Sequence, residues 1–202
     1  GSENLIAEID GKRLQTKRDL KQERSHFDKF IEACPLLSPL QNEDFLYAIS
    51  DPEECLEVLS ELQAYQEQVT IAWPKGESMR IRQQVSLSQF RLQIDAKNDW
   101  FSASGELQLE DGQLLNMQRL LALSQQARGR FIQLEDGQFL ALSKTFHKRL
   151  QELNRFGEVQ ADAVKLHPLA ALTLEDMAAE VGQLKAAKHW KQFSQRFEQA
   201  MA

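Results

Sequence analysis

The sequence predicts an α+β fold in which an antiparallel β-meander and hairpins are flanked by helices. Apolar residues recur at helical spacing in the first third of the chain and again towards its end, whereas they alternate with polar residues over much of the middle. Turn-forming residues separate the alternating runs, and the hexapeptide Gln-Leu-Glu-Asp-Gly-Gln occurs twice. A mostly antiparallel sheet with helices before and after it explains this change of period.

The first third of the chain predicts a short strand and two helices. Residues 5–9 alternate ahead of an Asp-Gly pair, which favours a strand followed by a turn. Thr16 and Asp19 have the spacing of a capping box, and the apolar stripe that follows predicts a helix. The pair Asp51-Pro52, followed by two acidic residues, predicts the start of the second helix.

The middle of the chain predicts a four-stranded antiparallel meander. Apolar and polar residues alternate in four consecutive runs with turn-like breaks between them. The predicted strands are residues 69–73, 79–85, 90–94 and 101–109. A later hairpin at residues 131–142 is expected to join this sheet or a neighbouring one.

The two copies of Gln-Leu-Glu-Asp-Gly-Gln, at residues 108–113 and 133–138, predict two tight turns. In both, an Asp-Gly pair follows an incoming strand, and both residues of such a pair tolerate a positive φ. The sequences around the two copies differ, and there is no third copy. We therefore expect one kind of turn used twice, and not a repeat array.

The last third of the chain predicts three helices and one more strand. An apolar stripe that ends at Gly157 predicts the first helix, and residues 164–168 favour a strand. Thr173 and Asp176 have capping-box spacing for a helix that ends at Gly182. The final helix stops within its apolar stripe at the last residue, so we expect the polypeptide to continue into a further domain.

Length and composition indicate a globular chain of one or two domains. The 202 residues are 42% hydrophobic and 27% charged, and no apolar run is long enough to cross a membrane. We expect a mostly helical segment at 1–68 and a mixed sheet-and-helix region at 69–202, with one compact domain as the alternative. Cys34 and Cys55 lack metal-type spacing and are expected to be packed thiols in a reducing, cytoplasmic environment.

The net charge of −6 argues against a free-standing nucleic-acid-binding protein, because such proteins usually carry a basic excess. Residues 36–70 contain eight acidic and no basic residues, which leaves a net charge of +2 for the rest of the chain. We expect the acidic run to be a solvated helix face.

The sequence contains no catalytic or metal-binding motif. A phosphate-binding glycine loop, a zinc-peptidase helix and a nucleophile elbow are all absent, and the four histidines are scattered. His26 and His147 are expected at the surface. Adjacent carboxylates occur at expected turns and helix starts, where turn formation and the helix dipole explain them. We therefore expect neither an enzyme nor a bound cofactor or metal in this chain.

One group of basic residues is a candidate nucleic-acid-binding surface. Arg80, Arg82 and Arg91 lie on the polar faces of two runs that are expected to pair across a short turn. Lys75 and Lys97 lie near the ends of these runs, so five positive charges could contact phosphate groups. An ordinary solvated sheet face is the alternative.

A second candidate site lies on the final helix. Trp190, Phe193 and Phe197 share one face of this helix. We expect the aromatic stripe to be exposed and to dock on the rest of a longer polypeptide or on a partner protein.

Four segments, residues 73–94, 99–115, 130–143 and 167–172, carry a resemblance to a known family. They resemble the helicase-associated domain that precedes the motor in bacterial Swi/Snf-type helicases. The resemblance implies that the parent protein is an ATP-dependent DNA translocase of superfamily two, with ATP and Mg²⁺ as cofactors of its motor. It supplies no catalytic residue for this chain.

The resemblance implies an accessory or regulatory domain that packs on the ATPase motor of the same polypeptide, in the bacterial cytoplasm or associated with the nucleoid. The alternatives are a DNA-binding module that uses the basic residues and a protein-interaction module that uses the final helix. The acidic residues of 43–67 could compete with DNA for the basic cleft of the motor. In that case, removal of residues 1–70 should raise the ATPase activity measured without DNA.

Overall fold

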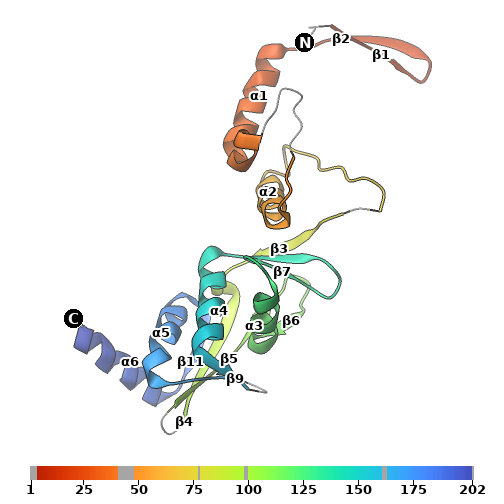
Figure 1. Cartoon of the computed structure of the whole chain (residues 1–202). Coiled ribbons are helices and arrows are strands. Elements are labelled where there is room, and N and C mark those ends of the chain that lie inside the picture. The colour runs from red at the N-terminus through yellow and green to blue at the C-terminus, as the bar shows by residue number, and fades with distance from the viewer. Residues whose placement is uncertain (1–3, 41–47, 77, 98–99, 161–162, 202) are drawn as a thin grey trace. The chain divides into compact units, whose positions relative to one another are not determined.

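The computed structural model describes residues 4–40, 48–76, 78–97, 100–160 and 163–201. The predicted α+β class is confirmed, since helices accompany antiparallel and mixed sheets (Figure 1). The chain divides into two compact units, Gly1–Lys75 and Gly76–Ala202. This boundary lies after the expected one, because residues 69–73 form no strand and belong to the first unit.

The first unit consists of a hairpin, two α-helices and a 3-10 helix. These elements are β1 (Asn4–Ile9), β2 (Lys12–Lys17), α1 (Leu20–Ala33), η1 (Pro35–Leu40) and α2 (Pro52–Ala64). The hairpin turns through Asp10 and Gly11, which have positive φ values of 52° and 72°. The sequence predicts β1 but not β2, because β2 is mostly polar and carries no apolar alternation.

Side-chain caps fix the starts of both α-helices. The Asp19 carboxylate accepts hydrogen bonds from the backbone N–H groups of Lys21 and Gln22. Asp19 is therefore the N-cap of α1, and the predicted capping box that starts at Thr16 is wrong. Asp51 accepts a backbone N–H of the first turn of α2 at 2.7 Å, as its Asp-Pro start predicts.

A small core joins the helices of the first unit. Cys34, Leu37 and Val58 are buried, and beside them the rings of Phe30 and Tyr65 lie with centroids 6.3 Å apart. Both cysteines are free thiols, and burial raises the pKa of each. The expectation of packed thiols is met by Cys34, which is buried, whereas Cys55 is only half-buried.

The second unit contains two sheets. The larger has the strand order β11-β4-β5-β10-β9, with β6 also paired to β5, and the smaller has the order β3-β8-β7. The larger sheet consists of β4 (Phe90–Lys97), β5 (Trp100–Gln108), β6 (Leu114–Asn116), β9 (Gly157–Val159), β10 (Val164–Leu166) and β11 (Gln183–Ala186). The smaller sheet consists of β3 (Ile81–Val85), β7 (Phe131–Gln133) and β8 (Phe139–Leu142). The helices are η2 (Leu87–Gln89), α3 (Met117–Gln126), α4 (Lys144–Phe156), η3 (Pro168–Ala170), α5 (Ala171–Glu180) and α6 (Lys188–Met201).

Only part of the predicted meander exists. The strands β4, β5 and β6 follow one another as antiparallel neighbours. The strand β3 pairs in parallel with β8 instead, because the segment between β3 and β4 coils into η2 and forms no hairpin. Gln89 closes η2 by accepting the Ser86 N–H at 3.0 Å. The β7–β8 hairpin therefore belongs to the neighbouring sheet, which is one of the two predicted arrangements.

The two Gln-Leu-Glu-Asp-Gly-Gln turns have the same geometry. In each, the Gly N–H donates to the Leu carbonyl, at 2.9 and 3.0 Å, and the Leu N–H donates to the carbonyl of the second Gln at 2.8 Å. The Asp carboxylate accepts the N–H of that Gln at 3.1 and 3.0 Å. The expectation that Asp shares the positive φ is wrong, since only Gly112 and Gly137 have it, as in a type I turn followed by a left-handed glycine. The prediction of one kind of turn used twice is confirmed.

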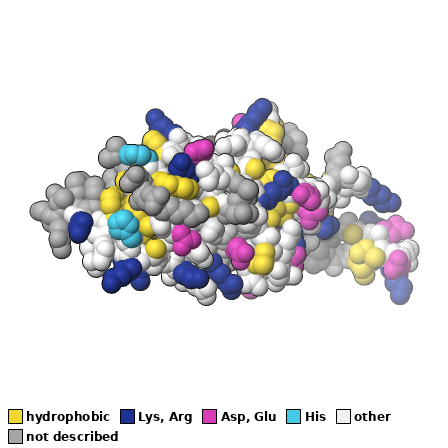
Figure 2. All heavy atoms as spheres, turned by 90° about the horizontal axis from the view of Figure 1, so that it is seen from below, with side chains coloured by type: hydrophobic (Ala, Val, Ile, Leu, Met, Phe, Trp, Pro, Cys, Tyr) yellow, Lys and Arg dark blue, Asp and Glu magenta, His cyan; other side chains and the backbone are white. Residues whose placement is uncertain are grey.

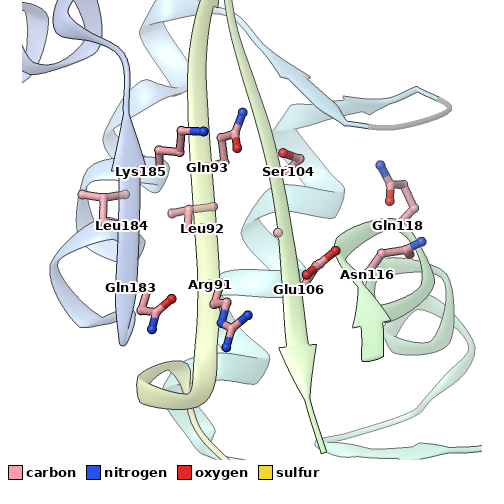
Figure 3. Close-up of a pocket in the computed structure, with 11 residues that line it drawn as sticks. Arg91, Leu92, Gln93, Ser104, Glu106, Asn116, Gln118, Gln183, Leu184 and Lys185 are labelled. Carbon is pink, nitrogen blue, oxygen red and sulfur yellow. The ribbon is translucent and has the colours of Figure 1, made fainter. Parts of the chain in front are cut away.

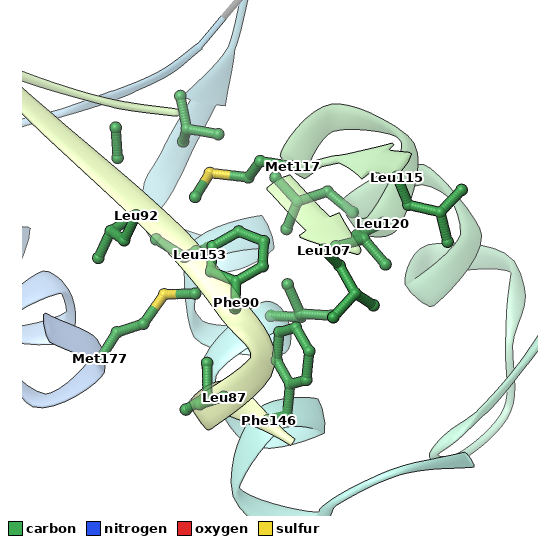
Figure 4. Packing of buried hydrophobic residues seen from close by; sticks show 14 of the residues in the cluster. Leu87, Phe90, Leu92, Leu107, Leu115, Met117, Leu120, Phe146, Leu153 and Met177 are labelled. Atoms are coloured by element: carbon green, nitrogen blue, oxygen red, sulfur yellow. The ribbon is translucent and has the colours of Figure 1, made fainter. Parts of the chain in front are cut away.

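Helices cover one face of the larger sheet. Phe90 and Ile94 of β4 are fully buried on this face, together with apolar residues of α3, α4, α5 and α6. Figure 4 shows Phe90 among Met117, Phe146, Leu153 and Met177 of these helices. The ring of Phe90 lies 5.6 Å from that of Phe146 on α4, centroid to centroid. The smaller sheet contributes Leu140 and other residues to the same core. Burial of these side chains is the main stabilising term of the second unit.

Only some of the helix ends predicted for the second unit are observed. The N–H of Gly157 donates to the Leu153 carbonyl and ends α4, as predicted. The helix α5 begins at Ala171 without a side-chain cap, because η3 leads directly into it. The capping box predicted at Thr173 is therefore wrong.

Candidate functional site

The five basic candidates belong to different elements of the structure. Arg82 lies on β3 in the smaller sheet, whereas Arg91 lies on β4 in the larger one. Lys75 belongs to the first unit, and Arg80 is exposed just before β3. Lys97 ends β4, and its side chain lies outside the described part of the structure. The predicted patch across a β3–β4 hairpin is wrong, because that hairpin does not exist.

Arg82 holds the two repeated turns together instead. Its guanidinium forms an ion pair with Asp111 of the first turn and donates a hydrogen bond of 3.0 Å to the side chain of Gln113. It also lies 3.7 Å from the carboxylate of Asp136 in the second turn. The neighbouring Gln83 is buried and accepts a backbone N–H of the first turn at 2.9 Å. Arg82 is thus neutralised by carboxylates and has a structural role.

The aromatic candidates on α6 pack against their own sheet. The side chain of Trp190 is only 3% exposed and meets the ring of Phe101 edge-on, with centroids 4.9 Å apart. Phe193 is half-buried, 5.1 Å from the same ring. The side chain of Phe197 lies outside the described part of the structure. The expectation of an exposed stripe is therefore wrong for Trp190, which is a core residue.

The face of the larger sheet opposite the helices presents mostly polar side chains, and we call it the open face. Strand alternation places these residues opposite the buried ones, and each of them is exposed or half-buried. The open face consists of Arg91, Gln93, Asp95, Trp100, Ser102, Ser104, Glu106, Gln108, Leu114, Asn116, Glu158, Lys165, Gln183 and Lys185.

Strand register fixes which side chains are neighbours on the open face (Figure 3). Arg91 pairs with Glu106 on β5 and with Gln183 on β11. Gln93 pairs with Lys185 on β11. Paired residues point to the same side of a sheet. Arg91 and Lys185 therefore lie on the same face of neighbouring strands, two positions apart in register.

Arg91 and Lys185 form few interactions with the rest of the described structure. Arg91 donates one weak hydrogen bond of 3.4 Å to Gln108. Among the residues that the structure describes, neither Arg91 nor Lys185 forms an ion pair with a carboxylate. Lys165 lies over the ring of Trp100, with its Nζ 4.4 Å from the ring centroid. The open face therefore has charged groups free to meet a partner.

The surface charge of the second unit is mixed. Residues 76–202 contain 16 basic and 15 acidic residues, a net charge of +1. On the face shown in Figure 2, Lys and Arg side chains are scattered among Asp and Glu side chains. A surface of alternating sign suits a protein partner better than the uniformly negative backbone of a nucleic acid.

Sequence reasoning missed the contribution of β11 to the open face. The sequence gives little sign of this strand, because it has only four residues and pairs in parallel with β4, far earlier in the chain. One signal lies in Gly182, just before β11. Its N–H donates to the Leu87 carbonyl at 3.1 Å, and a Cβ at this position would collide with the backbone of Ser88. A glycine after a helix can thus mark a close backbone approach.

Two titratable side chains with shifted pKa values, His147 and Arg149, lie on α4, away from the open face. Burial, together with the charge of Arg130, lowers the pKa of His147. The expectation of a surface histidine is not met, since His147 is half-buried. Burial disfavours the charge of Arg149, but hydrogen bonds to Glu152 and Glu180 outweigh it, so its pKa is raised. Arg149 also pairs with α5 and thereby ties the two helices together.

No family model, curated protein or solved structure matches this chain. In the part of the chain that the structure describes, no three His, Cys, Asp or Glu side chains are grouped so that they could hold a metal ion. The helices described are all too short or too polar to cross a membrane. The open face is the candidate functional site that the geometry offers.

Proposed function

We propose that this chain is a non-catalytic accessory domain of a bacterial Swi/Snf-type ATP-dependent DNA translocase, and that it acts by binding the ATPase motor of the same polypeptide. ATP and Mg²⁺ are then cofactors of the motor and not of this chain, and the protein works on DNA in the bacterial cytoplasm. The observation that carries the proposal is the open face, a polar surface on a sheet whose other side is fully packed. The four segments that resemble helicase-associated domains supply the family.

The geometry favours the motor over DNA as the partner of this surface. Arg82 is already paired with carboxylates, and Arg80 and Arg91 belong to different parts of the fold. The open face places Glu106 and Asp95 among its basic residues, and close carboxylates oppose phosphate binding. Burial of Trp190 also weakens the alternative of a partner protein that docks on the aromatic stripe of α6.

The test is a pair of binding measurements on the whole chain. Isothermal titration calorimetry against the separately expressed ATPase motor of the parent protein should show saturable binding. Fluorescence anisotropy with labelled single- and double-stranded DNA should show at most weak binding at about 50 mM salt and none at about 200 mM. Strong, steeply salt-dependent DNA binding together with no binding to the motor would contradict the proposal and favour a DNA-binding module.

We also propose that the acidic first unit regulates the ATPase activity of the motor. Residues 1–75 have a net charge of −7, from 8 basic and 15 acidic residues. Glu43 and Asp44 of the acidic run lie outside the described residues, but Glu54 and Glu57 lie on α2 in the structure. We expect this unit to compete with DNA for the basic cleft of the motor. Its removal from the parent should raise ATPase activity without DNA, and unchanged basal activity would exclude this competition.

A further inference from the structure

The open face contains a hollow of about 600 Å³ between β11, β4, β5 and the start of α3 (Figure 3). Most of the residues that line it have polar side chains, four amides among them, and Leu92 and Leu184 add apolar surface. These amide side chains are Gln93, Asn116, Gln118 and Gln183. Amides donate and accept hydrogen bonds equally well, so the lining matches a partner that offers both kinds of group.

The two sides of the hollow differ in charge. Lys185 on β11 and Arg91 on β4 line one side, and Glu106 on β5 lines the other. In the described structure none of the three has an ion-pair partner, even though Arg91 and Glu106 are cross-strand neighbours. The hollow is therefore dipolar, with two positive groups facing one negative group across the sheet.

Resting on the proposed function, we infer that the hollow is the docking site for a polar segment of the ATPase motor that carries an acidic and a basic side chain. The acidic side chain lies against Arg91 and Lys185, and the basic one lies against Glu106. This arrangement makes the partner's charges complementary to the dipolar lining.

The lining disfavours the other ligands that such a hollow could take. None of the residues that line it is aromatic, so a nucleobase has no ring to stack on. Glu106 would repel a phosphate that approached Arg91 along the strand pair. Asp95 already accepts the Gln93 Nε2 at 2.9 Å and adds negative charge further along the same face.

The test uses the whole chain, the separately expressed motor and calorimetry. The variant Arg91→Glu/Lys185→Glu should weaken motor binding by roughly 30-fold or more, because it removes two attractive charges and adds two repulsive ones. Glu106→Gln should weaken binding by roughly 3-fold, since one charge is lost without reversal. The matched control Arg128→Glu/Lys144→Glu changes the net charge equally at exposed positions outside the hollow, and it should change the affinity less than about 2-fold. Circular dichroism and thermal melting check that each variant is folded.

Each outcome has a distinct meaning. Equal losses in the charge-reversal variant and in its control, or no loss in either, would overturn the docking site while leaving an accessory domain that binds its motor elsewhere. A wild-type chain that does not bind the motor would overturn the proposed function, and the docking site with it. If a labelled 20-base-pair duplex binds the wild type and is lost only with Arg91→Glu/Lys185→Glu, the hollow is a DNA site and the inference is wrong.

Discussion

The two faces of the larger sheet are built from the same strands, but one face is packed against helices and the other is exposed to solvent. On β4, Phe90 and Ile94 enter a core shared with four helices, whereas Arg91 and Gln93 between them point to the open face. The covered face holds the fold together through apolar burial. On the open face, Arg91 forms one weak hydrogen bond and Lys185 forms no ion pair among the described residues, so we expect these two side chains to contribute little to stability.

This difference teaches where to look for function in a chain without catalytic motifs. Residues that stabilise a fold are already engaged, as Arg82 is between the two repeated turns. We expect residues that bind a partner to keep their charges available in the unbound protein, and Arg91 and Lys185 are both exposed. A substitution should therefore affect either the free energy of unfolding or the affinity for the partner, depending on the face that it changes.

The largest expected effect comes from substituting neighbours on β4. Phe90→Ala should lower the free energy of unfolding by about 3–5 kcal/mol, because a fully buried ring is lost from the core. Arg91→Ala, one residue further on the opposite face, should change it by less than about 0.5 kcal/mol. Urea denaturation followed by circular dichroism measures both values. Similar losses in the two variants would show that the faces do not differ in their contribution to stability.

A smaller loss is expected at the junction between η2 and β11. In Gly182→Ala the new Cβ would collide with the backbone of Ser88, so β11 must move relative to β4. We expect a loss of about 1–3 kcal/mol in unfolding free energy, together with weaker binding to the motor because Lys185 moves with the strand. Gln183→Ala, at an exposed neighbouring position, is the control. Wild-type stability in Gly182→Ala would mean that the close approach is not needed.

Arg82→Met removes the ion pairs that link the two repeated turns and leaves the open face unchanged. Its side chain is 21% exposed and its carboxylate partners are more exposed still, so the loss should be about 1 kcal/mol. Affinity for the motor should not change. A double-mutant cycle with Asp111→Asn, followed by urea denaturation, measures the coupling. Additive effects of the two substitutions would show that the ion pair contributes nothing.

The smallest effect is a dependence of stability on pH through His147. Its pKa in the folded state lies below the ordinary 6.5, so below that pH the unfolded chain binds more protons. The contribution of His147 is therefore complete above pH 6.5 and is lost as the pH falls towards the lowered pKa. His147→Gln should flatten this part of the stability profile, measured by urea denaturation between pH 7 and 5, and His26→Gln is the exposed control. A slope as steep as that of the wild type would exclude His147 as its source.

Local patterns in the sequence predict much of this fold. The alternation in 90–94 and 101–109 defines β4 and β5, and the repeated hexapeptide defines two turns of one geometry. Helical stripes likewise predict α2, α4 and α6. In each case the residues that decide the conformation are neighbours in the chain.

The features that the sequence does not predict depend on contacts between residues that are far apart in the chain. Residues 69–73 alternate like a strand but form no strand in the described structure, and β3 pairs with β8 across three intervening strands of the other sheet, β4, β5 and β6. The alternation correctly places Arg82 on a polar face, but it cannot show that Asp111 and Asp136 will neutralise it. Lys185 is absent from the sequence-based candidates because β11 is defined by its contact with β4.

Carboxyl footprinting of the whole chain, with and without the motor, tests the central claim most directly. Carbodiimide labelling of Glu106 should fall when the motor binds, because this residue lines the hollow on the open face. Glu135 in the second turn is 86% exposed and lies on the smaller sheet's hairpin, so its labelling should not change. Bound motor with undiminished labelling of Glu106 would contradict the claim that the open face is the interaction surface of this domain.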